Sequence, residues 1–354
     1  MISKSQIQQI GEVIDKYNQF IITTHVNPDG DGLGSEIALA NFLRQKKKAV
    51  KIINNSHVPE NYLFLDPNSE IELFSKDRHI EAVTSSDVIF ILDISDWARL
   101  RELGEIVQGL GTKKICIDHH PLREPFADLD IIYPEASSTG ELIFELLVGL
   151  GAKINQRISE AIYTAILTDT GSFRFTNTSP AAHRIVATLL ENGINPQKIY
   201  SNVYENQSLA KVRLMARVLN DLQLDYEGKL AWMRITQKML KQTGATLKDT
   251  EGLADYPRSI AGVEVALLFM ELEDGRVKIS FRSKGNVVIN GLAQYFSGGG
   301  HAFAAGATTD GPLEEVITRA IEKAGELFRS PAEEVMRGNN PPSVKISPPE
   351  YENG

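Results

Sequence analysis

The sequence predicts an α/β fold in two parts: an N-terminal domain with a mostly parallel sheet flanked by helices, and a smaller α/β domain after it. Three observations support this prediction. Over the first 200 residues, short apolar runs alternate with amphipathic stretches, a pattern typical of strands joined by crossover helices. From about residue 226 the pattern becomes β-rich. With 354 residues, the chain is also long enough to form two hydrophobic cores.

The elements of the first domain follow from its apolar periodicity. Apolar runs predict strands over 20–25, 49–54, 87–93, 113–118 and 130–133. Amphipathic spacing predicts helices over 33–47, 96–108, 138–150, 155–168 and 180–192. Ser138 and Glu141 have the spacing of a capping box, which marks the start of one of these helices.

The second domain is predicted to begin after a linker helix. Apolar residues at helical spacing predict that this helix lies within 201–225. Strands are expected over 229–235, 263–272 and 276–283, with Asp274-Gly275 as a hairpin turn, and a helix over 312–328. The expected domains therefore cover 1–200 and 226–330. The tail, 331–354, contains two Pro-Pro pairs and is expected to be flexible.

The composition is that of an ordinary globular protein, with 42% hydrophobic and 23% charged residues. No apolar run approaches the roughly 20 residues that cross a bilayer, and the N-terminus lacks the pattern of a signal peptide. We therefore expect a cytoplasmic protein without a membrane partner. The single cysteine, Cys116, excludes an internal disulfide and lies in an apolar run, where it is expected to pack in the core.

The net charge of −9 argues against a broad basic surface for long duplex nucleic acid. It leaves short nucleotides open as ligands, because bound divalent cations would reverse the sign of the local field.

The most informative motif is the first of four His and Asp clusters. His25, Asp29 and Asp31 lie within seven residues, directly after the apolar run 20–24. Pro28 and the glycines that alternate with these residues allow a sharp turn close to a bound ion or phosphate. Burial of these charges is unfavourable unless a cation lies between them. The motif therefore indicates a metal site.

Three further clusters have a similar form. Asp93 ends the apolar run 87–93, Asp118-His119-His120 ends the next run, and Asp169 ends a predicted helix. A single Asp after a strand is more often a helix N-cap or a turn residue. Four such clusters favour a different interpretation, since strand ends of an open parallel sheet converge on one crevice.

The donor types predict which metal is bound. Carboxylates with a few imidazoles suit Mn²⁺ or Mg²⁺, with zinc as an alternative. Two ions need a bridging carboxylate, and Asp93, alone on its strand, is the candidate. Such ions activate water and stabilise phosphoryl transfer.

The second domain contains a possible anion site. Arg282 and Ser283 end a predicted strand, and a triple-glycine turn followed by His301 comes after a short predicted helix. An arginine can bind a phosphate through two donors, and exposed backbone N–H groups can bind an anion. Alone, this motif is weak evidence. Beside a metal site it indicates the part of the protein that holds the substrate.

Together these motifs resemble the DHH phosphoesterase superfamily, named after the motif seen here at 118–120. The resemblance covers roughly residues 5–328, and the second-domain motifs resemble the DHH-associated domain. Within the superfamily, the motifs at 25–31 and 168–174 are most similar to the short two-domain, NrnA-type branch. Members of that branch are bifunctional oligoribonucleases and pAp phosphatases, where pAp is 3′-phosphoadenosine 5′-phosphate.

The resemblance implies a role for each candidate residue, with the active site in the cleft between the domains. One Mn²⁺ would be held by His25, Asp29 and Asp93. The other would be held by Asp31, Asp93, His119 and Asp169. His120 would contact the scissile phosphate or assist proton transfer, and Asp118 would orient the histidines. The phosphates or terminal nucleotide of the substrate would be held by Arg282, Ser283, Gly298, Gly299, Gly300 and His301.

The resulting hypothesis is a two-metal hydrolase of short single-stranded RNA and small nucleotides. It would degrade oligoribonucleotides (nanoRNA) to mononucleotides, dephosphorylate pAp, or both. Alternatives are a phosphodiesterase of cyclic dinucleotides or their linear products, and a non-catalytic nucleotide-binding regulator. The sequence does not rank the substrates. It also leaves open the polarity of attack and the choice between monomer and homodimer.

Overall fold

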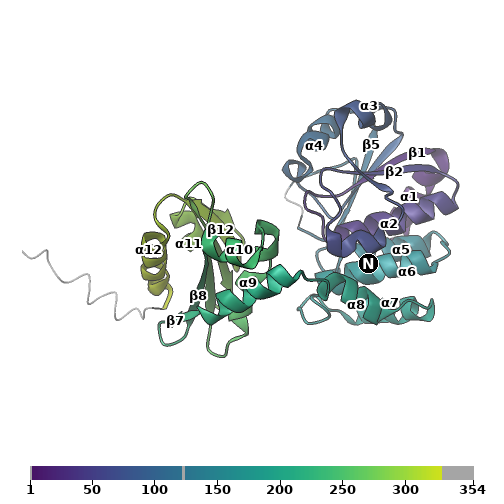
Figure 1. Ribbon diagram of the computed structural model, residues 1–354. Coiled ribbons are helices and arrows are strands. Elements are labelled where there is room, and N and C mark those ends of the chain that lie inside the picture. Colours follow the sequence, from purple (N-terminus) through teal and green to yellow (C-terminus); the bar gives the residue numbers. More distant parts are fainter. Residues whose placement is uncertain (1, 122–123, 329–354) are drawn as a thin grey trace, which may run out of the picture. The chain divides into compact units, whose positions relative to one another are not determined.

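The structure, a computed structural model, describes residues 2–121 and 124–328. Two units are distinguished, Met1–Asn206 and Gln207–Gly354, and each is described by itself (Figure 1). The expected flexible tail, 331–354, lies outside the described residues.

The first unit contains a six-stranded sheet in which every pair of neighbouring strands is parallel. The strand order is β3-β2-β1-β4-β5-β6, so the direction of strand addition reverses between β1 and β4. The strands are β1 (Gln19–Thr23), β2 (Ala49–Asn54), β3 (Ile71–Leu73), β4 (Val88–Leu92), β5 (Lys113–Asp118) and β6 (Leu129–Ile132). The predicted α/β architecture is confirmed. The sequence missed β3, a half-buried strand of three residues at the edge of the sheet.

Helices cover both faces of this sheet (Figure 1). Successive residues of β1 face opposite sides: Phe20 and Ile22 pack in the core that contains α2, α5 and α6, and Ile21 packs in the core that contains α3 and α4. The α-helices are α1 (Lys4–Lys16), α2 (Gly30–Gln45), α3 (Lys76–Thr84), α4 (Arg101–Gln108), α5 (Thr139–Gly149), α6 (Gln156–Asp169), α7 (Pro180–Glu191) and α8 (Pro196–Tyr204). Short 3₁₀ helices are η1 (Glu60–Leu65) and η2 (Trp97–Leu100). The sequence analysis did not predict α1, α3 or α8.

Helices α2 and α6 approach each other closely because glycines line their contact. A Cβ atom at Gly34 would collide with the backbone carbonyl of Ala161. A Cβ atom at Gly30 would lie 2.6 Å from Oγ1 of Thr168. This contact brings the first turn of α2 beside the last turn of α6.

The second unit contains helices and one mixed β-sheet. Its sheet has the order β11-β12-β10-β9-β8-β7; the β8–β9 pair is parallel and the other pairs are antiparallel. The strands are β7 (Gln223–Asp225), β8 (Leu230–Ile235), β9 (Val265–Glu271), β10 (Val277–Ser283), β11 (Gly299–Gly300) and β12 (Ala304–Thr309). The helices are α9 (Leu209–Asn220), α10 (Gln237–Thr243), α11 (Asn290–Tyr295) and α12 (Leu313–Gly325), with 3₁₀ helices η3 (Leu247–Thr250), η4 (Leu253–Ser259) and η5 (Glu326–Phe328). Across the described ranges, none of the helices combines the length and the apolar character of a membrane span.

The segment predicted as one linker helix, 201–225, differs in the structure. Helix α8 ends at Tyr204, and α9 begins at Leu209 after its N-cap, Ser208, whose side chain accepts a hydrogen bond from the next turn. Leu214 and Val218 of α9 pack into a core of the second unit. This helix is therefore a packed element of that unit, and its apolar spacing reflects core packing.

Candidate metal centre

Ionisable side chains follow three neighbouring strands of the first sheet at their carboxyl ends. His25 comes two residues after β1, Asp93 directly follows β4, and His119 directly follows β5. The order of the sheet reverses between β1 and β4, and ligand sites of open α/β sheets lie outside the strand ends at such a reversal. The sheet topology therefore gathers three of the residues that the sequence singled out.

Two helices bring three carboxylates to the same edge. Asp29 is the N-cap of α2 and accepts hydrogen bonds from the backbone N–H groups of Asp31 (3.0 Å) and Gly32 (3.2 Å). Asp31 lies in the first turn of α2, and Asp169 is the last residue of α6. Asp29 thus has the common capping role of an Asp after a strand. It nevertheless keeps a carboxylate oxygen close to His25 and Asp93.

The first ligand group is formed by His25, Asp29 and Asp93. One potential ligand atom from each lies within 4.8 Å of the others. Nε2 of His25 is 3.5 Å from Oδ2 of Asp93. Both residues are almost fully buried.

The second ligand group is formed by Asp31, His119 and Asp169, whose ligand atoms also lie within 4.8 Å of one another. Nε2 of His119 is 3.5 Å from Oδ2 of Asp169 and 3.8 Å from Oδ2 of Asp31. The same Nε2 is 3.8 Å from Oδ1 of Asp93, the carboxylate of the first group. Asp93 therefore lies at the junction of the two groups.

The histidine tautomers leave a nitrogen for a cation. Nδ1 of His25 is 2.9 Å from the carbonyl oxygen of Val26, and Nδ1 of His119 is 3.3 Å from that of Ala136. Donation to these carbonyls places the ring proton on Nδ1 and leaves Nε2 as a ligand. Nε2 of His119 is buried and has no hydrogen-bond partner among the described residues. A metal ion would satisfy it, so the donor set fits a metal.

The carboxylates repel one another in this buried setting. Burial raises the pKa of Asp31 well above its usual value, and the charges of Asp93 and Asp169 raise it further. Burial also raises the pKa of Asp169 to about 6. Asp93 behaves differently: burial opposes its ionisation, but a hydrogen bond from the protonated form of His25 and the charges of protonated neighbouring histidines lower its pKa. A divalent cation would relieve this repulsion.

Asp118 and His120 form a hydrogen-bonded pair beside the two groups. Oδ1 of Asp118 accepts from the backbone N–H of His120 at 2.9 Å and lies 2.8 Å from its Nδ1. This hydrogen bond is the main reason why the pKa of His120 is raised to about 9. The His120 side chain is 48% exposed, whereas Asp118 is fully buried. The pair therefore presents a cationic imidazole to solvent, 3.6 Å from Oδ1 of Asp93.

The N-terminus of α5 supports the centre in a way that the sequence did not reveal. The backbone N–H groups of Thr139 and Gly140 donate to the Asp31 carboxylate at 2.7 and 2.8 Å, and Oγ1 of Thr139 donates to Asp93 at 3.1 Å. The capping spacing predicted that a helix starts here, and Ser138 does cap it. Glu141, however, bonds to the backbone and side chain of Ser137, so the box is not reciprocal.

A buried Glu–Asn pair supports the end of β1. Oε2 of Glu36 accepts a hydrogen bond from Nδ2 of Asn54 at 2.8 Å, and Oδ1 of Asn54 accepts one from the backbone N–H of Thr24 at 3.1 Å. Thr24 directly precedes His25, so the pair helps to fix the backbone of a candidate ligand. Burial raises the pKa of Glu36 to about 8. In the sequence, Glu36 was indistinguishable from a solvent-exposed helix residue.

Asp93 has a left-handed backbone with φ of +58°. Among non-glycine residues, Asp and Asn adopt this conformation most readily. Its backbone N–H donates to the carbonyl of Ile117 at 3.0 Å, and Thr139 holds its carboxylate. The chain therefore turns sharply at the residue that joins the two ligand groups.

In the second unit, the predicted substrate-binding residues lie along β10 and the β11–β12 hairpin. Arg282 pairs with Ala304 across the sheet, and the backbone N–H of Ser283 donates to the carbonyl of Phe303 at 2.9 Å. His301 follows β11 in the same hairpin. The guanidinium of Arg282 is 3.4 Å from Oδ1 of Asp255, a partner that the sequence did not indicate.

The three glycines before His301 differ from the expected open turn. Gly299 and Gly300 form the edge strand β11, which pairs with β12, and the N–H of Gly298 already donates to the carbonyl of Ala293 at 2.9 Å. Glycine is required because a Cβ at Gly300 would lie 2.6 Å from the backbone of Ala305. The turn itself is formed by the residues after the glycines.

Comparisons with known proteins agree with this architecture. Residues 19–168 match the DHH family, N-terminal domain, and residues 229–330 match the DHHA1 domain. The chain is 31% identical over 300 residues to the bifunctional oligoribonuclease and PAP phosphatase NrnA of Bacillus subtilis, covering 83% of this chain and 90% of that protein. It is 30% identical over 310 residues to the protein of the same name from Thermus thermophilus, covering 86% and 89%. A crystal structure of an exopolyphosphatase-related protein from Bacteroides fragilis gives a TM-score of 0.86 at 32% identity, covering 93% of this chain and 99% of that one.

Proposed function

The chain belongs to the DHH phosphoesterase family of hydrolases, and on this basis we propose that it is a two-metal phosphoesterase of short nucleotides. Its substrates are oligoribonucleotides, which it degrades from one end to mononucleotides, and pAp, which it dephosphorylates. The observation that carries the proposal is the pair of ligand groups that meet at Asp93, at the reversal point of the sheet. Two relatives named as bifunctional oligoribonuclease and PAP phosphatase, which match 83% and 86% of this chain, support the choice of substrates.

The two ligand groups are proposed to hold two Mn²⁺ ions. One ion is assigned to His25, Asp29 and Asp93, and the other to Asp31, Asp93, His119 and Asp169. The two oxygens of Asp93 support its bridging role, because Oδ2 lies near His25 and Oδ1 near His119. The excess of carboxylates over imidazoles and the absence of thiolate ligands favour Mn²⁺ or Mg²⁺ over zinc. When bound, such ions supply activation of water and stabilisation of charge on phosphoryl oxygens.

His120 is proposed to be the catalytic acid. Its Nδ1 proton is held by Asp118, which leaves Nε2–H as the donor to a phosphate or leaving-group oxygen. The raised pKa of about 9 keeps the imidazole cationic at neutral pH, so it favours negative charge on the substrate. Asp118 is a positioning residue, since it acts through His120.

Substrate phosphates or the terminal nucleotide are assigned to the second unit. The assigned residues are Arg282, Ser283, Gly298, Gly299, Gly300 and His301. Arg282 offers a planar cation for phosphate, and the backbone bond between Ser283 and Phe303 brings the end of β10 to the same hairpin as His301. Because the N–H of Gly298 is engaged, Gly298 contributes close backbone packing and not an anion-binding donor.

A substrate panel tests the proposal. Labelled RNA of two to five nucleotides, pAp and a cyclic dinucleotide are incubated with the purified protein in Mn²⁺ and in chelator. We expect mononucleotides from the RNA and phosphate from pAp in Mn²⁺ only, with labels at either end of the RNA giving the polarity of attack.

The panel also separates the alternatives. Turnover of the cyclic dinucleotide alone would replace the proposed activity with that of a cyclic-dinucleotide phosphodiesterase. Binding of the nucleotides without any turnover would refute the enzyme and indicate a regulator.

A further inference from the structure

The loop that follows Asp169 has an unusual backbone. Three consecutive residues, Gly171, Ser172 and Phe173, have φ angles of +55°, +61° and +64°. Two of them are not glycine, and side chains rarely adopt this conformation unless the surroundings impose it. Backbone hydrogen bonds hold the turn: Ser172 N–H donates to the carbonyl of Leu167 at 2.8 Å. The two residues that follow this turn have no role in the proposed reaction.

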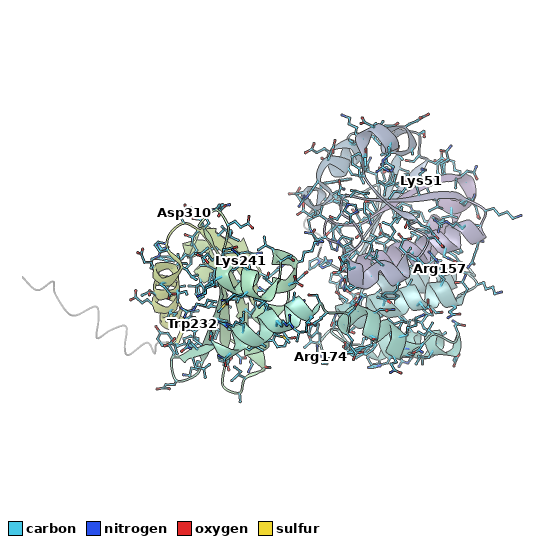
Figure 2. All side chains as sticks on the ribbon, in the orientation of Figure 1. Lys51, Arg157, Arg174, Trp232, Lys241 and Asp310 are labelled. Atoms are coloured by element: carbon cyan, nitrogen blue, oxygen red, sulfur yellow. The ribbon has the colours of Figure 1, made fainter. Side chains whose placement is uncertain are left out.

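Those two residues are Arg174, which is labelled in Figure 2, and Phe175. Both are exposed. Nε of Arg174 donates to the carbonyl of Gly171 at 2.7 Å. Within the described part of the chain, no hydrogen bond or ion pair engages its two Nη groups. Phe175 is 53% exposed, and its ring covers Gly171 so closely that a Cβ there would lie 2.6 Å from a ring carbon. The loop therefore presents a cation with free donors beside an aromatic ring.

Helix α8 extends this surface with two tyrosines. Burial raises the pKa of Tyr204, whereas a hydrogen bond with Ser172 and the charge of Arg174 lower it. Tyr204 therefore lies beside the loop. The Tyr204 ring lies 4.9 Å from that of Tyr200, which is 42% exposed. We name Arg174, Phe175, Tyr200 and Tyr204 the Arg174 patch.

The Arg174 patch adjoins the metal centre. Its loop begins two residues after Asp169, the end of α6. On the other side, Tyr62 lies between Tyr204 and the first turn of α2. Burial raises the pKa of Tyr62, and Asp29 and Tyr204 are close enough to raise it further. Tyr62 also bonds to the backbone of Gly30. A ligand at the metal centre can thus extend onto the patch without leaving the first unit.

The aromatic rings and the guanidinium of the patch indicate which kind of ligand it binds. Exposed aromatic rings stack on unpaired bases, and a guanidinium with free Nη groups binds the neighbouring phosphate. A duplex has no free base faces, and an apolar partner would desolvate the arginine without compensation. We infer that the Arg174 patch binds the second nucleotide of an oligoribonucleotide whose terminal nucleotide is held elsewhere. The inference rests on the proposed function, and it separates the two substrates, because pAp has no second nucleotide.

The experiment compares an RNA trinucleotide with pAp. Arg174→Ala and Phe175→Leu should raise KM for the trinucleotide about tenfold, as expected for loss of one stacked or charged contact, with kcat little changed. KM for pAp should stay within about twofold, since binding of a single nucleotide does not involve the patch. Phe175→Trp, which keeps a stacking face, should retain the wild-type KM. The matched control is Arg78→Ala, an exposed arginine of α3 at the opposite end of the first unit from α8 (Figure 1).

An unchanged trinucleotide KM, or an equal loss for both substrates, would overturn the inference. Unchanged pAp turnover shows that the variants fold. Binding of a fluorescent trinucleotide with non-hydrolysable methylenephosphonate linkages, followed by anisotropy in Mn²⁺, tests the patch independently of turnover. If the wild-type protein binds this ligand but hydrolyses neither substrate, the proposed function fails, and weaker binding by Arg174→Ala still supports the patch. If Arg174→Ala and the wild type bind it equally, the patch is refuted.

Discussion

Glu36 provides a direct test of the electrostatics beneath the metal centre. It is fully buried, and its pKa is raised from 4.5 to about 8, chiefly by burial. A group whose pKa is higher in the folded state contributes stability that is complete below the unfolded pKa. That stability is lost as the pH rises towards the folded pKa. Substitution by Gln removes the titration while keeping the shape and the hydrogen bond with Asn54.

The size of the effect follows from the pH range between the unfolded pKa of 4.5 and the folded pKa of about 8. Each pH unit inside it costs the wild type about 1.36 kcal/mol relative to a variant that does not titrate. Between about pH 5.5 and 7.5, Glu36→Gln should therefore gain up to about 2.7 kcal/mol over the wild type. The direction is fixed: the advantage of the variant grows with pH.

The assay is urea unfolding in chelator at several pH values across this window. Trp97 lies in the first unit and Trp232 in the second, so a Trp232→Phe background makes tryptophan fluorescence specific for the first unit. Glu81→Gln, on the exposed surface of α3, controls for the loss of one carboxylate. A difference between Glu36→Gln and wild type that does not vary with pH would refute the reasoning.

Four further predictions concern the centre itself. Asp93→Asn should abolish turnover and reduce the bound Mn²⁺ measured by calorimetry; full occupancy of two ions would refute the bridge. Asp118→Asn should lower the pKa of His120, so the fall of kcat at high pH should move to lower pH; an unchanged profile would exclude His120 as the acid. Gly140→Ala should displace the N–H donors of Asp31, because its Cβ collides with α6, and weaken metal affinity about 10- to 100-fold. Chelation should lower the melting temperature of the first unit, and Mn²⁺ at about 100 times its Kd should restore about 2.7 kcal/mol; a melting temperature insensitive to Mn²⁺ would contradict a site in this unit.

The positions of three candidate ligands at strand ends could be predicted from the sequence. His25, Asp93 and His119 follow buried apolar runs, and such runs are visible in a sequence because both faces of a parallel sheet are covered. The residues that support them were not predictable in the same way. Thr139 and Gly140 act through backbone N–H groups, which any residue carries. Their role depends on where the start of α5 lies in space.

Other differences have equally local causes. The glycines before His301 have the composition of an open turn, but pairing with β12 makes them a strand. The segment at 201–225 has continuous helical spacing, but the cap at Ser208 starts a new helix. In the first case the pairing of two strands decides the local structure, and in the second case a helix cap decides it.

The glycine-lined contact between α2 and α6 has a consequence for how metal preference evolves. Asp31 lies in the first turn of α2 and Asp169 ends α6, and the close approach of these two helices depends on Gly34, which meets the backbone of Ala161. Ions that share the same donors are distinguished by the geometry of the cage. Substitutions along this helix contact would therefore change which ion is preferred while all six proposed ligands stay unchanged. A lineage adapting to a different metal supply could change its cofactor at positions that no comparison of ligand motifs would flag.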